Sequence, residues 1–294
     1  MERELWRIIV AALKGIPPTR PRNAVYTDRQ IVAVLLWAAL YDRPVSWACQ
    51  RRNWPMQAWR RSLPDQSTMS RRLRRADTRG LLLVLLMALQ RGLGETDVLV
   101  VDGKPLELSD NTGDPDARTG RGVGRFGKGY KLHLILDARA QAVRAYQVHP
   151  LNVAETTTAA RLLRWPRTRI RRGSLLLGDR LFDSNPLHAA AHRRGCQLVA
   201  PRQKPEKGIT CWGQHPGRLE SIRLTEGSGR AHWERVLAPQ RTSIERFFGT
   251  LTCVGGGMAA LPPWGRRLHR VRLWVGAKLA INAARIARRR SPAA

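Results

Sequence analysis

Acidic residues are scarce in this chain of 294 residues, where 22 Asp or Glu stand against 52 Lys or Arg and the formal net charge is +30. Long apolar runs are also absent, because runs such as residues 81–89 are too short to cross a bilayer. The four cysteines form no C-x-x-C pair, so the sequence predicts neither a zinc ribbon nor a disulfide framework. The first residues, Met1-Glu-Arg-Glu, lack a signal-peptide pattern. We therefore expect a reduced, cytoplasmic protein with no membrane partner.

The positive charge is spread along the whole chain. The excess of basic over acidic residues is +10 over residues 1–96, +7 over 97–200 and +13 over 201–294. Seven of the basic residues are Lys and 45 are Arg, whose planar guanidinium grips phosphate with two hydrogen bonds. A GC-rich genome can account for Arg in place of Lys, but it does not account for the few acids. The charge therefore predicts a long polyanion as the partner, and ten Trp residues indicate a folded chain.

Residues 1–96 are predicted to be helical. Thr27-Asp28 can begin a helix that runs to Leu40, and Ser67 or Thr68 can cap a short, strongly basic helix. Two further helices are predicted at 46–53 and 79–91. Short helices with a basic member are typical of a helix-turn-helix DNA-binding region, and equally of a helical bundle with one solvated basic face.

Residues 97–294 have a different pattern, in which short apolar runs alternate with helical segments. This alternation predicts an α/β fold with a mixed sheet and flanking helices. Residues 201–240 show no clear periodicity, which predicts a loop-rich or β insertion. The predicted strands are 98–101, 131–136, 142–148, 174–177 and 197–200, and the predicted helices are 153–164, 185–194, 244–254 and 268–289.

The last predicted helix, 268–289, has two faces. Its apolar face is expected to pack against the sheet. Its other face is predicted to meet either DNA or solvent, and carries Arg267, Arg270, Lys278, Arg285 and Arg288.

Three acids stand at the ends of apolar elements. Asp102 follows a strand, Asp179 follows another, and Glu245 opens a helix as the last acid of the chain. Singly, they fit a turn, a strand end and a helix-capping box. Together, carboxylates from neighbouring elements can hold two divalent ions about 3.5–4 Å apart, and oxygen-only ligands favour Mg²⁺ or Mn²⁺. The sequence thus predicts phosphoryl transfer on a polyanion that the basic surface holds.

Four motifs carry a family resemblance. They are Val-Val-Asp102-Gly-Lys-Pro-Leu, Gly-Lys-Gly-Tyr130-Lys-Leu-His133, Leu-Gly-Asp179-Arg-Leu-Phe-Asp183-Ser and Arg241-x-x-x-Glu245-Arg-Phe-Phe-Gly. With Pro64-Asp-Gln-Ser-Thr68 upstream and Lys278-Leu-x-Ile-Asn282 downstream, the chain resembles bacterial insertion-sequence transposases of the DDE type over roughly residues 63–285.

The resemblance implies a ribonuclease H-like catalytic fold, which we assign to residues 97–294. The helical region 1–96 that precedes it is the DNA-binding region that the basic helix predicts. It implies that Asp102, Asp179 and Glu245 are the catalytic residues and the metal ligands, with two Mg²⁺ or Mn²⁺ ions. The sequence departs from the family pattern at Ala238 and Thr252, where many relatives have Tyr and Lys.

The implied function is a nucleoid-associated DNA transposase that cleaves element ends and joins them to target DNA, acting on terminal inverted repeats as a homo-oligomer. Two alternatives remain open: a catalytically inactive DNA-binding descendant, and a metal-dependent nuclease that does not join DNA.

Several basic residues are predicted to contact DNA. The glycine-rich stretch 113–129 is interpreted as a mobile loop that closes on a strand, with a passive linker as the alternative. Asp183 is interpreted as a helix cap and not as a metal ligand. The predicted DNA contacts are Arg71, Arg72, Arg121, Arg125, Lys128, Lys131, Arg241 and Arg246.

Overall fold

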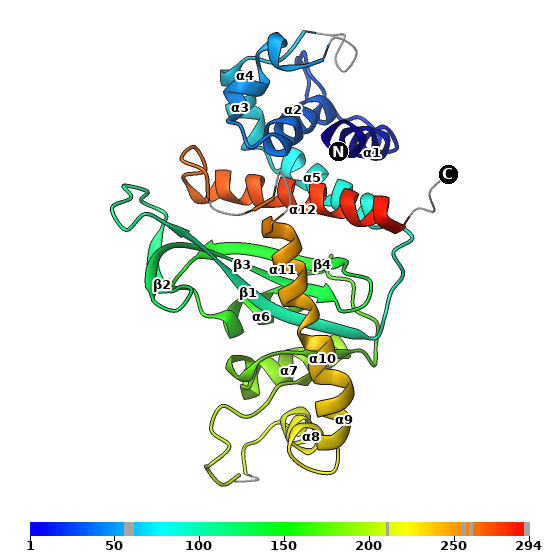
Figure 1. Cartoon of the computed structure of the whole chain (residues 1–294), viewed down its shortest axis with the longest axis vertical. Helices are drawn as coiled ribbons and strands as arrows, with labels where there is room; N and C mark the ends of the chain where they lie inside the picture. The colour runs from blue at the N-terminus through cyan, green and yellow to red at the C-terminus, as the bar shows by residue number, and fades with distance from the viewer. Residues whose placement is uncertain (56–61, 210–211, 254–256, 259–260, 291–294) are drawn as a thin grey trace. The chain divides into compact units, whose positions relative to one another are not determined.

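The computed structural model describes residues 1–55, 62–209, 212–253, 257–258 and 261–290 (Figure 1). The chain forms two units: unit 1 comprises Met1–Leu93 and Thr250–Ala294, and unit 2 comprises Gly94–Gly249. This division differs from the expected one, because the C-terminal segment groups with the N-terminal helices and not with the sheet. No helix in the described ranges has the length and apolar character needed to cross a membrane.

Unit 1 is helical, as predicted for its N-terminal part. Helix α2 (Asp28–Leu40) is buried on nearly every face, which explains why its sequence is apolar on all sides. The helix begins where Thr27 and Gln30 form a reciprocal capping box. The described elements are α1 (Glu2–Lys14), α2 (Asp28–Leu40), α3 (Val45–Ala48), η1 (Arg51–Asn53), α4 (Gln66–Leu73), α5 (Ala76–Leu89) and α12 (Leu268–Arg290).

Aromatic rings fill part of this unit. The rings of Trp37 and Trp54 stack with centroids 4.6 Å apart, and Trp6 meets Trp37 edge-on at 4.9 Å. The indole nitrogens of Trp37 and Trp54 donate to the backbone carbonyls of Asn53 and Ala48. Trp6, Trp37 and Trp54 therefore serve the packing of this unit.

Helix α12 packs on α1, α2 and α5. The expectation that it packs against the sheet is therefore wrong. Lys278 and Arg285, predicted on an exposed face, are only 1% and 4% exposed. The Lys278 ammonium donates to Ala39 O at 2.7 Å and pairs with Asp42, so it caps the C-terminal end of α2. These two cations are used inside unit 1.

Unit 2 contains a curled mixed sheet with flanking helices. Its strands run in the order β2-β3-β1-β5-β6, and β4 also pairs with β3. The pairs β2/β3, β3/β4 and β1/β3 are antiparallel, whereas β1/β5 and β5/β6 are parallel. This mixed α/β architecture fits the ribonuclease H-like expectation. The strands are β1 (Val98–Leu108), β2 (Arg118–Arg121), β3 (Phe126–Asp137), β4 (Val143–Pro150), β5 (Leu175–Leu177) and β6 (Gln197–Val199).

One face of the sheet packs against α6 (Glu155–Arg164) and α7 (Asn185–Arg194). The core there includes Leu99 and Val101 of β1, Ile135 of β3 and Leu162 of α6. On the same side of β5, the short 3-10 helix η2 (Arg180–Phe182) adds the buried ring of Phe182. This packing fixes which side chains of β1 point toward the core and which point away.

One prediction for unit 2 is wrong in type, and another holds only in part. The stretch 113–129 is not a single loop, since β2 and the first residues of β3 form a hairpin within it. The described part of 201–240 contains no strand: residues 201–209 and 212–215 lie outside helices and strands, as a loop-rich stretch predicts, whereas the residues from 216 onward form α8 (Pro216–Thr225), α9 (Arg230–His232), a π-helix η3 (Trp233–Leu237) and the first residues of α10 (Ala238–Arg241). The unit continues into α11 (Ser243–Cys253).

Candidate active site

Asp102 lies within β1 on the face opposite the α6 and α7 core. Val101 belongs to that core, and successive side chains of a strand point to opposite faces. Lys104, on the same face as Asp102, lies over the ring of Phe248 of α11 at 5.7 Å. The Asp102 carboxylate therefore belongs to the side of β1 that carries α11, and Asp102-Gly103 is not the hairpin turn that one interpretation allowed.

Asp179 occupies the matching position after the neighbouring strand. β1 and β5 are parallel, with Val100 opposite Leu177, so Asp102 and Asp179 each come two residues after a paired position. The Asp179 carboxylate accepts a hydrogen bond from the Leu181 amide at 2.8 Å, which caps η2. The parallel register brings these two predicted residues to the same part of the sheet.

The electrostatics of Asp102 reflect this neighbourhood. Burial, together with the negative charges of Asp179 and Glu155, raises its pKa to about 7 against the opposing effects of the Gly103 amide and the Arg241 guanidinium. Its Oδ1 accepts a hydrogen bond from the Gly103 amide at 2.7 Å. Asp102 is thus a partly buried acid that forms no ion pair with the described residues and feels the charge of Arg241.

Glu245 lies in the first turn of α11 with its side chain 59% exposed. Its nearest cation is Arg241 of α10, whose Nη2 lies 3.3 Å from the Glu245 Oε1. Arg241 also acts on Asp102 through its charge. Thr242 does not form the expected capping box, because its hydroxyl donates to Pro239 O at 2.8 Å. Arg241 therefore stands in electrostatic contact with two of the predicted acids.

Glu155 is a neighbour of Asp102 that sequence reasoning missed. It opens α6 and pairs with Lys131 at 2.7 Å, and both side chains are largely buried. A Cβ on Gly103 would lie 3.2 Å from Glu155 Oε1 and 3.0 Å from Lys131 Cδ, so this pair needs the glycine beside Asp102. A Glu in the first turn of a helix is an ordinary feature, and nothing in the sequence marked it.

The described residues contain no group of three or more His, Cys, Asp or Glu side chains arranged to hold a metal ion. Asp183 belongs to another cluster, where the Arg218 guanidinium donates to both of its oxygens at 2.7 Å. Burial alone would raise the pKa of Asp183, but the bonds from Arg218 outweigh it and the pKa lies well below its ordinary value. Asp183 is thus tied to α8, and the expected side-chain cap of α7 is absent.

The predicted DNA contacts fall into two groups. Arg72 is 8% exposed, and its guanidinium donates to Asp28 at 2.8 Å and to Tyr26 O at 2.7 Å. Lys131 is 6% exposed in its pair with Glu155. These two side chains have fixed internal partners, in contrast to the exposed position expected for a DNA contact.

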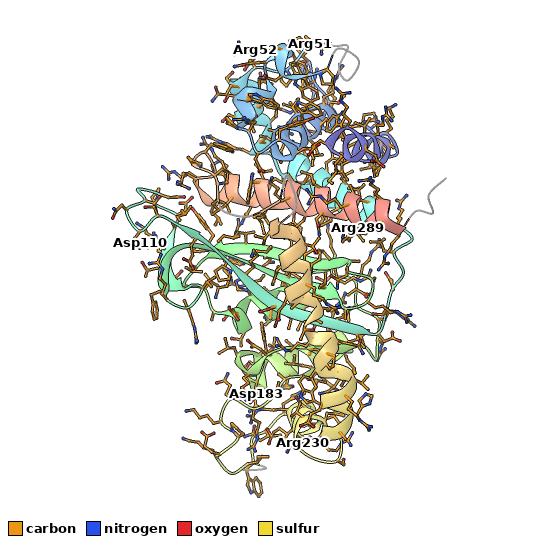
Figure 2. The ribbon with its side chains drawn as sticks, viewed as in Figure 1. Arg51, Arg52, Asp110, Asp183, Arg230 and Arg289 are labelled. Carbon is orange, nitrogen blue, oxygen red and sulfur yellow. The ribbon has the colours of Figure 1, made fainter. Side chains whose placement is uncertain are left out.

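The other predicted contacts reach the surface. Arg71, Arg121, Arg125 and Arg246 are exposed, and Lys128 and Arg241 are partly buried. Arg125 also pairs with Asp110 at 3.1 Å. Exposed arginines occur in both units, as Figure 2 shows for Arg51, Arg52, Arg230 and Arg289. The positions that differ from the family pattern, Ala238 and Thr252, lie in α10 and α11.

Residues 93–257 match the profile of a protein family described as a transposase DDE domain. This range includes Asp102, Asp179 and Glu245, and it begins one residue before unit 2. No curated protein and no solved structure matches the chain.

Proposed function

We propose, because the chain belongs to the transposase DDE-domain family, that it cleaves the ends of an insertion element and joins the released 3′-hydroxyls to target DNA. The single observation that carries this proposal is the pair of carboxylates at matched positions, each two residues after the paired residues Val100 and Leu177 of the parallel strands β1 and β5. Burial and the charge of Asp179 raise the pKa of Asp102 to about 7. A buried carboxylate with a second carboxylate nearby favours the binding of a cation at this site.

The donor atoms suit a hard divalent ion. Asp102, Asp179 and Glu245 offer carboxylate oxygens, the donors that Mg²⁺ and Mn²⁺ prefer. A positive charge beside Asp102 would offset the burial and the repulsion that raise its pKa. Asp102 and Asp179 would hold the ion, and Glu245 would join them on leaving Arg241. When bound, such ions activate a water or 3′-hydroxyl and stabilise the leaving oxygen in phosphoryl transfer.

The chain's own side chains have separate tasks in this proposal. Arg241 pairs with the Glu245 carboxylate, and where an ion held Glu245, the Arg241 guanidinium would be available to a phosphate. Arg121, Arg125, Lys128 and Arg246 hold the phosphodiester backbone beside acids that would otherwise repel it. The buried cations Arg72 and Lys131 have no part in DNA contact here.

An assay that measures cleavage and strand transfer in the same reaction tests the proposal. The substrate is labelled duplex DNA from both flanks of the coding sequence, with Mg²⁺ and a target plasmid. We expect the wild-type chain to nick the flank and join it to the plasmid. Asp102→Asn should lower both rates at least about 100-fold, while duplex binding persists. At ~1.36 kcal/mol per tenfold, this is a loss of about 2.7 kcal/mol of transition-state stabilisation. Asp97→Asn, a change of an exposed acid just before β1, should keep both activities.

Glu245 has a matched control in the same unit. Glu234 is also an exposed glutamate with an arginine four residues before it, Arg230, at 2.8 Å. Glu245→Gln should abolish cleavage and joining, and Glu234→Gln should leave both unchanged. If the chain cleaves DNA but does not join it, the protein is a nuclease and not a transposase. If it binds DNA but does not cleave it, the protein is an inactive DNA-binding descendant. Cleavage that survives Asp102→Asn would refute the assignment of this site.

A further inference from the structure

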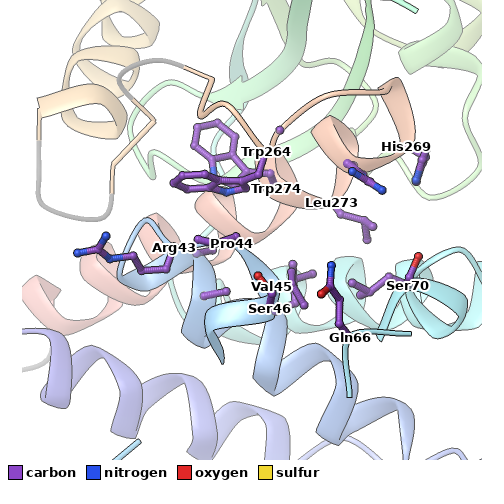
Figure 3. Close-up of a pocket in the computed structure, with 16 residues that line it drawn as sticks. Arg43, Pro44, Val45, Ser46, Gln66, Ser70, Trp264, His269, Leu273 and Trp274 are labelled. Carbon is purple, nitrogen blue, oxygen red and sulfur yellow. The ribbon is translucent and has the colours of Figure 1, made fainter. Parts of the chain in front are cut away.

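Each unit contains a feature that the proposed chemistry does not use. In unit 1 it is a pocket of about 170 Å³, with the indoles of Trp264 and Trp274 on one side (Figure 3). None of the described residues that line this pocket is acidic, so it is not suited to a divalent cation. In unit 2 it is a cluster of polar side chains around Asp183, four residues after Asp179. The second feature bears on the predicted metal site.

The turn that carries Asp179 is fixed at its beginning and along its length. The amide of Gly178 donates to Val199 O of β6 at 3.0 Å. Asp179 then caps η2 through the Leu181 amide, and the ring of Phe182 is buried in the core. A Cβ on Gly178 would lie 2.9 Å from Phe182 Cβ, so the end of β5 and the turn are in close contact. The position of the Asp179 carboxylate therefore depends on how this turn is held.

Asp183 holds the other end of the turn. Its side chain is 2% exposed, and each of its oxygens accepts a hydrogen bond from Arg218 of α8 at 2.7 Å. The backbone amide of Gln203 donates to Asp183 Oδ2 at 3.4 Å, and the Gln203 side chain donates to Leu181 O at 3.4 Å. His188 of α7 lies beside the carboxylate, with its Nε2 3.5 Å from Asp183 Oδ1. Asp183 thus joins η2 to α8 and to the segment that follows β6.

The form of this ion pair suits it to fix an orientation. Two parallel N–H···O bonds from a planar guanidinium define a direction as well as a distance. Burial alone would raise the pKa of Asp183, but the bonds from Arg218 hold it well below its ordinary value, so both groups stay charged at neutral pH. The pair does not cap α7, whose N-cap residue Ser184 makes no side-chain bond to the helix. Its two partners are therefore the turn that carries Asp179 and helix α8.

We propose that Asp183 and Arg218 are positioning residues for the metal site. Their ion pair holds the η2 turn, and with it the Asp179 carboxylate, in the arrangement that binds a divalent ion. The inference rests on the proposed function in taking Asp179 as a metal ligand, and neither Asp183 nor Arg218 contacts the ion itself. Replacing a residue that orients a metal ligand typically weakens metal affinity about 10- to 100-fold. Loss of this pair should therefore weaken metal binding while the chain still folds.

A Mn²⁺ titration of the full-length chain, followed by electron paramagnetic resonance of the free ion, tests the proposal without any reaction. We expect Asp183→Asn and Arg218→Gln to bind Mn²⁺ about 10- to 100-fold more weakly than the wild-type chain. Arg218→Lys should give an intermediate affinity, because an ammonium keeps the charge and loses the two-bond geometry. In the cleavage assay, the Mg²⁺ concentration for half-maximal rate should rise by the same factor, with the rate at saturating Mg²⁺ within about threefold of wild type.

Arg144→Gln is the matched control. Arg144 and Asp137 form a second buried ion pair of unit 2, also at 2.7 Å, with side chains 10% and 0% exposed against 20% and 2% for Arg218 and Asp183. This pair joins β3 to β4 instead of holding η2. Arg144→Gln should therefore lower the stability of unit 2 as Arg218→Gln does, and keep the wild-type affinity for Mn²⁺.

Hydrogen exchange separates a loosened turn from an unfolded chain. In Asp183→Asn, peptides covering η2 should exchange faster than in the wild-type chain, and peptides covering β1 should not change. If the ion-pair variants do not fold, Gln203→Ala provides the test, because it removes only an exposed side chain that bonds to the turn. It should weaken Mn²⁺ binding in the same direction.

Wild-type Mn²⁺ affinity in the folded variants, or an equal loss in Arg144→Gln, would overturn the inference. In both cases a wild-type chain that binds Mn²⁺ and cleaves the flanking DNA leaves the proposed function standing. A wild-type chain that neither binds Mn²⁺ nor cleaves DNA would contradict the proposed function, and the inference with it.

Discussion

Replacing Asp102 with Asn should stabilise unit 2 at alkaline pH. The carboxyl has its pKa raised from 3.8 to about 7, first by burial and then by Asp179 and Glu155. Between these values the folded chain keeps a proton that the unfolded chain has released, so stability is lost as the pH rises from about 4 to about 7. At about 1.36 kcal/mol per pKa unit, the loss is at most about 4 kcal/mol above pH 7, since Asp102 keeps some contact with solvent.

The neutral amide of Asp102→Asn carries no such cost. We expect the variant to match the wild-type chain at pH 4 and to exceed its stability at pH 8 by up to about 4 kcal/mol. Hydrogen exchange of peptides covering β1, read by mass spectrometry in EDTA, measures the difference locally. The β1 amides of the variant should exchange up to about 1000-fold more slowly at pH 8, a ratio in which intrinsic exchange rates cancel.

Asp97→Asn provides the control, because Asp97 is exposed and lies directly before the same strand. It should not change β1 exchange at either pH. Equal protection of wild-type and Asp102→Asn chains at pH 8, or a difference that persists at pH 4, would refute the reasoning. Added Mg²⁺ should slow exchange in the wild-type chain and leave the variant unchanged.

Two further predictions concern packing. Gly120→Ala should destabilise unit 2 by about 1–3 kcal/mol in urea denaturation, because its Cβ would lie 2.5 Å from the backbone oxygen of Leu151; Gly80→Ala, in α5 with nothing within 4 Å, should instead stabilise unit 1 by about 0.5–1 kcal/mol. Arg72→Met should destabilise unit 1 by about 3–5 kcal/mol in thermal unfolding, because buried Asp28 loses its cation. The neighbouring Arg71→Met should have almost no effect, and a large loss there would contradict this account.

Local signals in the sequence predicted much of the secondary structure. The capping pair Thr27 and Gln30 acts within one turn, so the start of α2 is legible without tertiary contacts. The apolar run before Asp102 predicted a buried strand, and the structure extends it to Leu108 as β1. The family profile supports the resemblance that the motifs carried. Such signals depend only on residues that are close in the chain, so they can be recognised from the sequence without knowledge of the tertiary structure.

Long polar side chains were harder to predict. Arg72 and Lys131 looked like surface cations, but each meets an acid from a distant segment, Asp28 at 44 positions and Glu155 at 24 positions away. A buried cation requires such a partner, and its arrival depends on how the helices and strands pack. Lys278 is the same case, since its partners at the end of α2 lie more than 200 positions away.

The sequence by itself determined the partner class and the candidate acids, because net charge and the rarity of Asp and Glu are properties of composition. It also placed Asp102 and Asp179 after apolar strands. Only the tertiary structure decided that β1 and β5 are parallel neighbours with these two acids in matched register, and that Glu155 and Arg241 influence Asp102. The physical reason is that burial and electrostatic interaction depend on distances in space, which strand pairing and helix packing set and which spacing along the chain does not encode.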